Sequence, residues 1–267
     1  ALQADNLHFL QQHGVSFALC EAYRLQAHIV YYLGDDHAHT DYLKKVVEVA
    51  EQGKFTSFIH NAFYILERKG TPGVIEMAEA FLARQRQRGD LVMLGLALHQ
   101  LGRMYLNAQQ YEPAQRALNE AIVLWRQLGG AQGQGAGLQW SLIDRGQVAR
   151  FAGEGALALR CFDESIALFA ASPYPVGSTF PLLYRGHVYL LHDELDCALD
   201  DFRQAISVVT AFGQRGGENL LIREVASVGE SARRATDWFW AGQLFAAAVT
   251  ADTRSMTPSN KGLLYEV

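Results

Sequence analysis

The sequence predicts an all-helical protein built as a solenoid of about six stacked helix pairs. One spacing pattern recurs along the chain, breaks rich in glycine and proline separate its copies, and no segment shows sustained period-2 alternation of apolar residues. Each copy has a small anchor residue, preceded by an apolar residue four positions earlier. After the anchor, a small residue stands at the twelfth position, a large residue at the sixteenth and another small residue at the nineteenth. This spacing is typical of two antiparallel helices joined by a short turn.

The clearest copy has Gly102 as its anchor, with Leu98 before it and Ala114, Leu118 and Ala121 after it. Further anchors occur at intervals of 44, 40 and 43 residues, at Gly146, Gly186 and Gly229. Because small residues let two helices approach closely, we expect the anchors to lie where paired helices touch. The later positions of these three copies hold, in order, Ala158, Phe162 and Ser165; Ala198, Phe202 and Ala205; and Ala241, Phe245 and Ala248.

Upstream of Gly102 the pattern is looser. Residues 55–69 and 74–88 are predicted helices around a Gly-Thr-Pro-Gly turn, with Ala62 as the anchor, although Val74 and Phe81 replace the small residues. Residues 16–33 and 40–52 form an earlier predicted pair with Ala27 as its anchor. The downstream breaks are residues 129–135, 172–175 and 213–217, where glycine and proline are expected to end helices.

Composition favours a folded chain, because 49% of the 267 residues are hydrophobic and 19% are charged. The net charge of −5 gives no electrostatic reason for this segment to bind nucleic acid, and no apolar run is long enough to span a membrane. Three widely spaced cysteines without a paired motif indicate buried thiols in a reducing compartment. With no break in composition, residues 1–267 are expected to form one domain. Since the chain begins with Ala1, we expect it to be a fragment of a longer protein.

These residues resemble the tetratricopeptide (TPR) repeat over about residues 15–250, with a period of about forty instead of the usual 34. The repeat texture of residues 88–102 and the tail formed by Ala241–Ala248, Thr257-Pro258 and Tyr265-Glu266 resemble a narrower group. That group is the C-terminal sensor arrays of MalT and large LuxR-type STAND ATPase regulators. The resemblance implies a right-handed superhelix acting as a cytoplasmic sensor arm, attached to a switch domain in the full-length chain.

Three segments have compositions that could support chemistry. Asp35–Asp41 is rich in metal ligands, but its position before an apolar-periodic run favours a helix N-cap over a metal site. Residues 133–137 are glycine-rich, yet no strand precedes them and no lysine follows, which argues against phosphate binding. Trp238 and Trp240 are predicted to pack at the solenoid end, with ligand stacking as the alternative. With no catalytic constellation, we expect neither an enzyme nor a cofactor or metal site.

The first helix of each pair lines the concave groove in TPR-like superhelices, so residues near the anchors are the predicted ligand contacts. Arg103 and Arg150 are the best candidates for binding an anion, because a guanidinium binds a carboxylate with two hydrogen bonds. A merely solvated inner surface is the alternative. The predicted groove residues are His28, Tyr31, His60, Phe63, His99, Arg103, Trp140, Asp144, Gln147, Arg150, Tyr184 and His187.

The sequence therefore predicts a ligand- or partner-sensing arm of a cytoplasmic signal-transducing transcriptional regulator. The arm would bind a small-molecule effector, a protein or a peptide in its groove, without contacting nucleic acid or a membrane. The alternative is a free-standing TPR adaptor that holds other proteins together.

Overall fold

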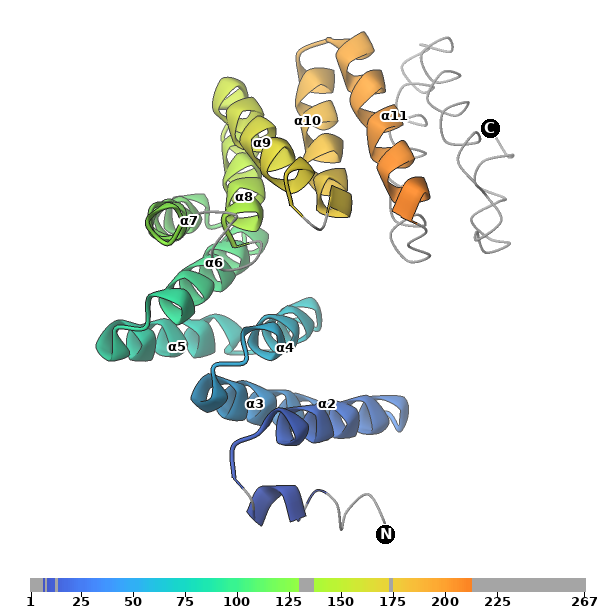
Figure 1. The fold of residues 1–267 in the computed structure, drawn as a ribbon. Coiled ribbons are helices and arrows are strands. Elements are labelled where there is room, and N and C mark those ends of the chain that lie inside the picture. The colour runs from blue at the N-terminus through green and yellow to red at the C-terminus, as the bar shows by residue number, and fades with distance from the viewer. Residues whose placement is uncertain (1–6, 8, 13, 130–136, 173–174, 213–267) are drawn as a thin grey trace. The chain divides into compact units, whose positions relative to one another are not determined.

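A computed structural model describes residues 7, 9–12, 14–129, 137–172 and 175–212 (Figure 1). The chain divides into two compact units, residues 1–128 and 129–267. Within the described ranges all regular secondary structure is helical, as predicted. The assignment of residues 1–267 to one domain stays a prediction.

The first unit contains three successive helix pairs, and the second contains two within the described residues (Figure 1). The predicted sixth pair around Gly229, together with Trp238, Trp240 and the tail, lies outside the described residues. The three pairs of the first unit are formed by α2 (Phe17–Tyr32), α3 (Asp36–Gly53), α4 (Thr56–Arg68), α5 (Val74–Arg88), α6 (Leu91–Asn107) and α7 (Tyr111–Gln127), and residues 9–12 before them are also helical. Those of the second are α8 (Gly137–Phe151), α9 (Gly155–Ala170), a short 3-10 helix η2 (Pro175–Ser178), α10 (Thr179–Leu191) and α11 (Leu195–Phe212).

The glycine anchors lie at the closest approach of paired helices, as the pattern predicts. A Cβ atom placed on Gly146 would lie 2.5 Å from Cε1 of Phe162, and one on Gly186 would lie 2.6 Å from Cε1 of Phe202. The same atom on Gly102 would lie 2.6 Å from Cγ of Leu118. The large residue sixteen positions after each anchor therefore fills the space that the missing side chain leaves.

The turn between the two helices has the same geometry in four of the five described pairs, all except α4–α5. A residue in the left-handed region follows the anchor by seven positions, at Gly34, Gln109, Gly153 and Asp193. In the α6–α7 turn the Gln109 amide donates to the Leu106 carbonyl at 2.9 Å, and the Gln110 amide donates to the Tyr105 carbonyl at 2.8 Å. This is the Schellman arrangement, which satisfies the last carbonyls of the first helix and reverses the chain in three residues.

The α4–α5 pair departs from this plan. Its turn, Lys69–Gly73, has two extra residues, and its first left-handed residue is Gly70. The Thr71 amide donates to the Leu66 carbonyl at 3.0 Å, which makes Phe63 the equivalent of the anchors. The predicted anchor, Ala62, is wrong by one residue.

Phe63 brings a ring to the place where other pairs have a small residue. It faces Phe81 with 5.7 Å between ring centroids, and both side chains are fully buried. Two rings need more room than a glycine and one ring, so α4 and α5 touch far less than the other paired helices. The predicted groove residue Phe63 is therefore a core residue instead.

The helix α5 packs little on α4 and is joined instead to Glu51 of α3 by hydrogen bonds and ion pairs, which we call the Glu51 clamp. The Glu51 carboxylate, 7% exposed, accepts hydrogen bonds from Arg84, Gln85 and Arg88 at 2.8–3.0 Å. Bonds from two guanidinium groups and an amide compensate for burying the charge, which would otherwise be strongly unfavourable.

The predictions for the helix cap and the cysteines have mixed outcomes. Asp35 is the N-cap of α3 and its carboxylate accepts from the Ala38 amide at 2.9 Å, which confirms the capping interpretation. Cys20 and Cys161 are buried, and burial raises the pKa of the Cys20 thiol to about 11. Cys197 is exposed, so the expectation of a buried thiol is wrong there.

None of the described helices is long and apolar enough to cross a membrane.

Replacing Gly146 with alanine is expected to lower the free energy of unfolding by about 1–3 kcal/mol, because the added methyl group would overlap the Phe162 ring. Helix propensity alone would favour alanine by about 1 kcal/mol, so a net loss measures the steric conflict. Urea denaturation checks this. In a Phe162→Leu background the same change should be much less destabilising, and an equal loss in both backgrounds would contradict the packing account.

Candidate functional site

A polar cluster joins α4 and α6, the first helices of two neighbouring pairs. We call it the α4–α6 polar cluster. Side chains spaced three, four or seven residues apart share a face of each helix, which brings the two sets together. The cluster contains His60, Tyr64 and Glu67 of α4, and His99, Gln100, Arg103 and Asn107 of α6.

Three predicted groove residues meet here. The rings of His60 and His99 stack, with 6.2 Å between centroids and 7° between planes. Arg103 donates from Nη2 to Oε1 of Gln100 at 3.0 Å. The Gln100 oxygen thus accepts from Arg103, and its amide nitrogen faces Nδ1 of His60 at 2.5 Å. An amide nitrogen can only donate, so Nδ1 of His60 accepts and the ring proton lies on Nε2.

The charged part of the cluster is nearly buried. Nη2 of Arg103 lies 2.8 Å from Oε2 of Glu67, and these side chains are 13% and 12% exposed. Asn107 donates from Nδ2 to the other oxygen of Glu67. Arg103 is therefore paired with Glu67, although Nε of Arg103 and Oε2 of Glu67 are buried without a hydrogen-bond partner among the described residues. Arg103 is thus not the freely available anion partner that the sequence predicts.

The accessible members of the cluster include Tyr64, which is 39% exposed, and Asn107, which is also exposed. The Arg103 guanidinium lies 5.1 Å from the centre of the Tyr64 ring, and that of Arg68 lies 5.6 Å away. The Arg68 guanidinium also donates to the Tyr64 hydroxyl at 3.4 Å. This combination of an aromatic ring and an exposed guanidinium can stack on a flat group or bind a carboxylate.

Two predicted residues on α2 lie elsewhere in the same unit. Nε2 of His28 lies 3.3 Å from Nη1 of Arg24. Tyr31 is half exposed, and Nζ of Lys69 lies 4.6 Å above its ring. Neither residue contributes to the α4–α6 polar cluster through the contacts described above.

In the second unit several predicted groove residues are partly used in packing. Trp140 lies 5.5 Å from both Phe169 and Phe180, measured between ring centroids, and Tyr184 lies 6.1 Å from Phe162.

Two polar groove residues of α8, Gln147 and Arg150, interact within their own helix. Arg150 donates from Nε to Oε1 of Gln147 at 2.8 Å, and its guanidinium lies 4.3 Å from the Phe151 ring centre. Asp144 is half-buried on the same helix.

His187 is held neutral in the folded protein. Its ring packs against Phe202 at 5.7 Å, and Nε2 has no hydrogen-bond partner among the described residues. Burial, assisted by the positive charge of Arg150, lowers the pKa of His187 to about 4. At neutral pH this side chain cannot supply a positive charge to an anionic ligand.

Four members of the cluster, Tyr64, Glu67, Gln100 and Asn107, were not predicted from the sequence. For α4 the cause is the one-residue error in the anchor. Counted from Phe63, the position after the anchor is Tyr64 and the fourth position is Glu67, while His60 becomes the equivalent of His99. The two extra residues of the Lys69–Gly73 turn obscured this register.

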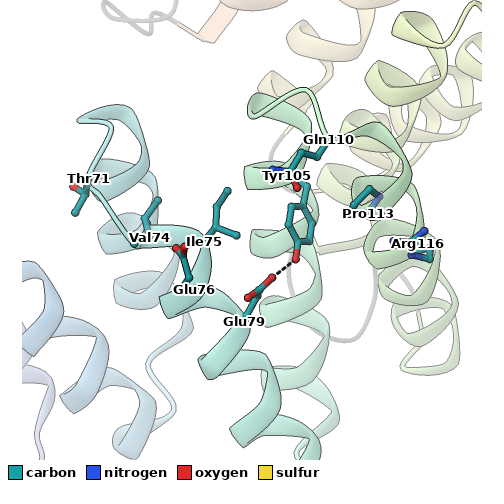
Figure 2. Close-up of a pocket in the computed structure, with 10 residues that line it drawn as sticks. Thr71, Val74, Ile75, Glu76, Glu79, Tyr105, Gln110, Pro113 and Arg116 are labelled. Atoms are coloured by element: carbon teal, nitrogen blue, oxygen red, sulfur yellow. Dashed lines mark hydrogen bonds between the residues drawn. The ribbon is translucent and has the colours of Figure 1, made fainter.

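A separate pocket lies in the first unit where the start of α5 meets the end of α6 and the start of α7. Its volume is about 430 Å3, and no sequence motif predicted it. Figure 2 shows Glu79 of α5 facing Tyr105 of α6, with Glu76 nearer the start of α5 and with Pro113 and Arg116 of α7 beyond Tyr105.

The Tyr105 hydroxyl donates to the Glu79 carboxylate across the pocket. Burial, followed by this hydrogen bond, raises the pKa of Tyr105 to about 12. In the parts of the chain that the structure describes, no group of three or more His, Cys, Asp or Glu side chains is placed to hold a metal ion.

No family model and no curated protein matches the sequence. Solved structures match the fold. A Rap protein complexed with competence and sporulation factor has a TM-score of 0.59 at 13% identity, covering 94% of this chain and 80% of that one. The STAND protein with a TPR sensor from Pyrococcus horikoshii has a TM-score of 0.54 at 18% identity, covering 88% of this chain but 39% of that one.

Kinesin-light-chain TPR-like repeats from Podosopora anserina give a TM-score of 0.54 at 12% identity, over 77% of this chain and 97% of that one. These similarities confirm the predicted TPR-like fold. They include a protein of the STAND class that the sequence resembles.

Replacing Glu67 with alanine is expected to lower the free energy of unfolding by about 3 kcal/mol, because it leaves the nearly buried Arg103 guanidinium without its carboxylate. Chemical denaturation measures the loss. The control is Glu112→Ala, which removes a carboxylate that is 93% exposed and 3.9 Å from Arg116. Equal stabilities of the two variants would contradict the role given to the Glu67–Arg103 pair.

His187 should make the second unit acid-sensitive. Its pKa falls from the usual 6.5 to about 4 on folding, so the unfolded state binds the proton more tightly. Stability is therefore unaffected above about pH 6.5 and falls as the pH drops towards 4, by about 3 kcal/mol in total. A His187→Leu variant should lose less stability than the native chain between pH 7 and pH 4.5, measured by denaturation. Parallel losses in the two proteins would refute this.

Proposed function

We propose that this chain is the ligand- or partner-sensing arm of a cytoplasmic signal-transducing transcriptional regulator. The arm binds a small molecule or a protein on the surface formed by the first helices of its repeats. An attached switch domain in the full-length protein responds to the binding.

The observation that carries this proposal is the α4–α6 polar cluster. Its internal hydrogen bonds and ion pair fix the side chains before any ligand arrives, so binding loses little conformational entropy. The exposed Tyr64 ring and the Arg68 guanidinium are groups that a ligand can reach. Tyrosine and arginine are also the residues most enriched among strong contributors to protein interfaces.

The similarity to a STAND protein with a TPR sensor supports the regulator context. The chain covers 39% of that protein's length, so the rest of that protein contains other parts to which its sensor can be coupled. A ligand shifts a switch only if it binds two arrangements of the protein unequally. The α4–α5 junction, with its limited helix contact, is a place where two such arrangements can differ.

The alternative is a free-standing adaptor that holds proteins together without relaying a signal. The similarity to kinesin-light-chain repeats, which spans nearly all of that chain, favours it. The full-length gene product separates the two proposals. A nucleotide-binding domain or a helix-turn-helix region in the same polypeptide supports the regulator, and a chain of repeats alone supports the adaptor.

A thermal-shift screen against sugars, nucleotides and short peptides tests for binding. For any compound that stabilises the protein, Tyr64→Ala and Arg68→Ala are each expected to weaken binding about tenfold or more. Both side chains are exposed, so the variants should fold normally. Arg103→Ala is a poorer choice, because it also breaks the ion pair with Glu67.

The matched control is Arg160→Ala, which removes an exposed arginine from the second helix α9. Its affinity for the same compound should equal that of the native chain. A compound whose binding is indifferent to Tyr64→Ala and Arg68→Ala would contradict the assignment of the α4–α6 polar cluster. Stabilisation by peptides alone would favour the adaptor.

A further inference from the structure

We propose that the pocket between α5, α6 and α7 binds a basic amino acid, a ligand with two cationic groups and one carboxylate. The site is distinct from the α4–α6 polar cluster, because no residue of that cluster lines the pocket. The volume of about 430 Å3 falls within the range of about 300–1,000 Å3 that is usual for small-molecule sites.

One wall of the pocket is acidic. Glu76 and Glu79 lie about one turn apart on α5 and both line the pocket, with the Glu79 carboxylate turned towards Tyr105 and the Glu76 carboxylate towards the start of α5 (Figure 2). The N-terminus of α5 carries about half a positive charge, which offsets part of the charge of Glu76 in the first turn. Glu79 lies beyond the first turn and keeps its full effect, so it is the stronger of the two cation partners.

Tyr105 orients the Glu79 carboxylate so that it can bind a cation. Its hydroxyl donates to one oxygen of Glu79 and holds the carboxylate in the pocket. With a pKa near 12 the phenol keeps its proton at physiological pH and stays a donor. An ionised carboxylate accepts several hydrogen bonds, so Glu79 retains capacity for an ammonium or guanidinium group.

The other wall carries a guanidinium with unused donors. Arg116 is 71% exposed, and its contact with Glu112, also exposed, is 3.9 Å long. Such a pair is weak in water and leaves most of the five N–H donors available. A carboxylate is the group that a guanidinium binds best, through two parallel hydrogen bonds.

The middle of the pocket is apolar. Ile75 and Pro113 contribute hydrocarbon surface between the two walls, and Val74 adds more beside Glu76, which suits the methylene stem of an arginine or lysine. Two carboxylates and one guanidinium give the lining a formal charge of −1. A free basic amino acid has two cationic groups and one carboxylate, and so a net charge of +1. Its cationic groups can pair with the two glutamates and its carboxylate with Arg116.

Isothermal titration calorimetry of the whole chain tests the proposal with L-arginine, agmatine and a peptide ending in arginine. L-Arginine is expected to bind with a dissociation constant below about 1 mM. Glu79→Gln should weaken it about tenfold and Glu76→Gln should weaken it less, since the amide keeps the shape and loses the charge. Agmatine, which lacks the carboxylate, should bind about tenfold more weakly than L-arginine.

Arg116→Gln should weaken L-arginine but leave agmatine unchanged, because only L-arginine has a group for Arg116 to bind. The control is Glu48→Gln, which removes one exposed carboxylate of α3 outside the pocket and should change nothing. Binding should also be indifferent to Tyr64→Ala, which separates this site from the proposed sensing surface.

Three results would overturn the proposal. The first is the absence of binding heat with L-arginine at about 10 mM. The second is L-arginine binding that Glu79→Gln leaves unchanged. The third is tighter binding of the peptide than of L-arginine, which would reject a free amino acid as the ligand.

Discussion

The close approach of two helices at a small residue is the constraint on which the repeat depends. At Gly102, Gly146 and Gly186 a Leu or Phe side chain of the second helix occupies the space that a Cβ atom would need. Protein interiors are packed too tightly to absorb an extra methyl group without movement. The anchor therefore sets the distance between paired helices, and with it the position of every side chain that the first helix presents to a ligand.

The α4–α5 pair illustrates the effect of a large residue at the anchor position. Phe63 and Phe81 pack together inside the pair, the turn gains two residues, and α5 depends on the Glu51 clamp from α3. The start of α5, the end of α6 and the start of α7 enclose the pocket next to this irregular pair. One departure from the repeat thus accompanies both the clamp and the pocket in this unit.

Sequence reasoning recovered the fold because packing residues repeat at a fixed spacing, and the spacing survives changes in residue type. It placed α5 at residues 74–88, as the structure does, and found the N-cap at Asp35. Site residues obey no such rule, because their partners lie on another helix. Arg103 appeared free in the sequence, and its pairing with Glu67 became visible only when α4 and α6 were placed side by side. Phe63 was misassigned since a two-residue insertion shifts the register without changing the amphipathic pattern of α4.

The sparse contact between α4 and α5 also bears on how the first unit folds and fluctuates. In repeat proteins, stability is close to a sum of terms between neighbouring elements, so cooperativity is lowest where one such term is small. The α4–α5 junction is such a point, where the segments before and after it are joined by the Phe63–Phe81 rings, the Glu51 carboxylate of α3 and the α4–α6 polar cluster. We therefore expect the boundary between α4 and α5 to be the part of the first unit that opens most readily, so that amides at this junction exchange with solvent before those inside the closely packed helix pairs.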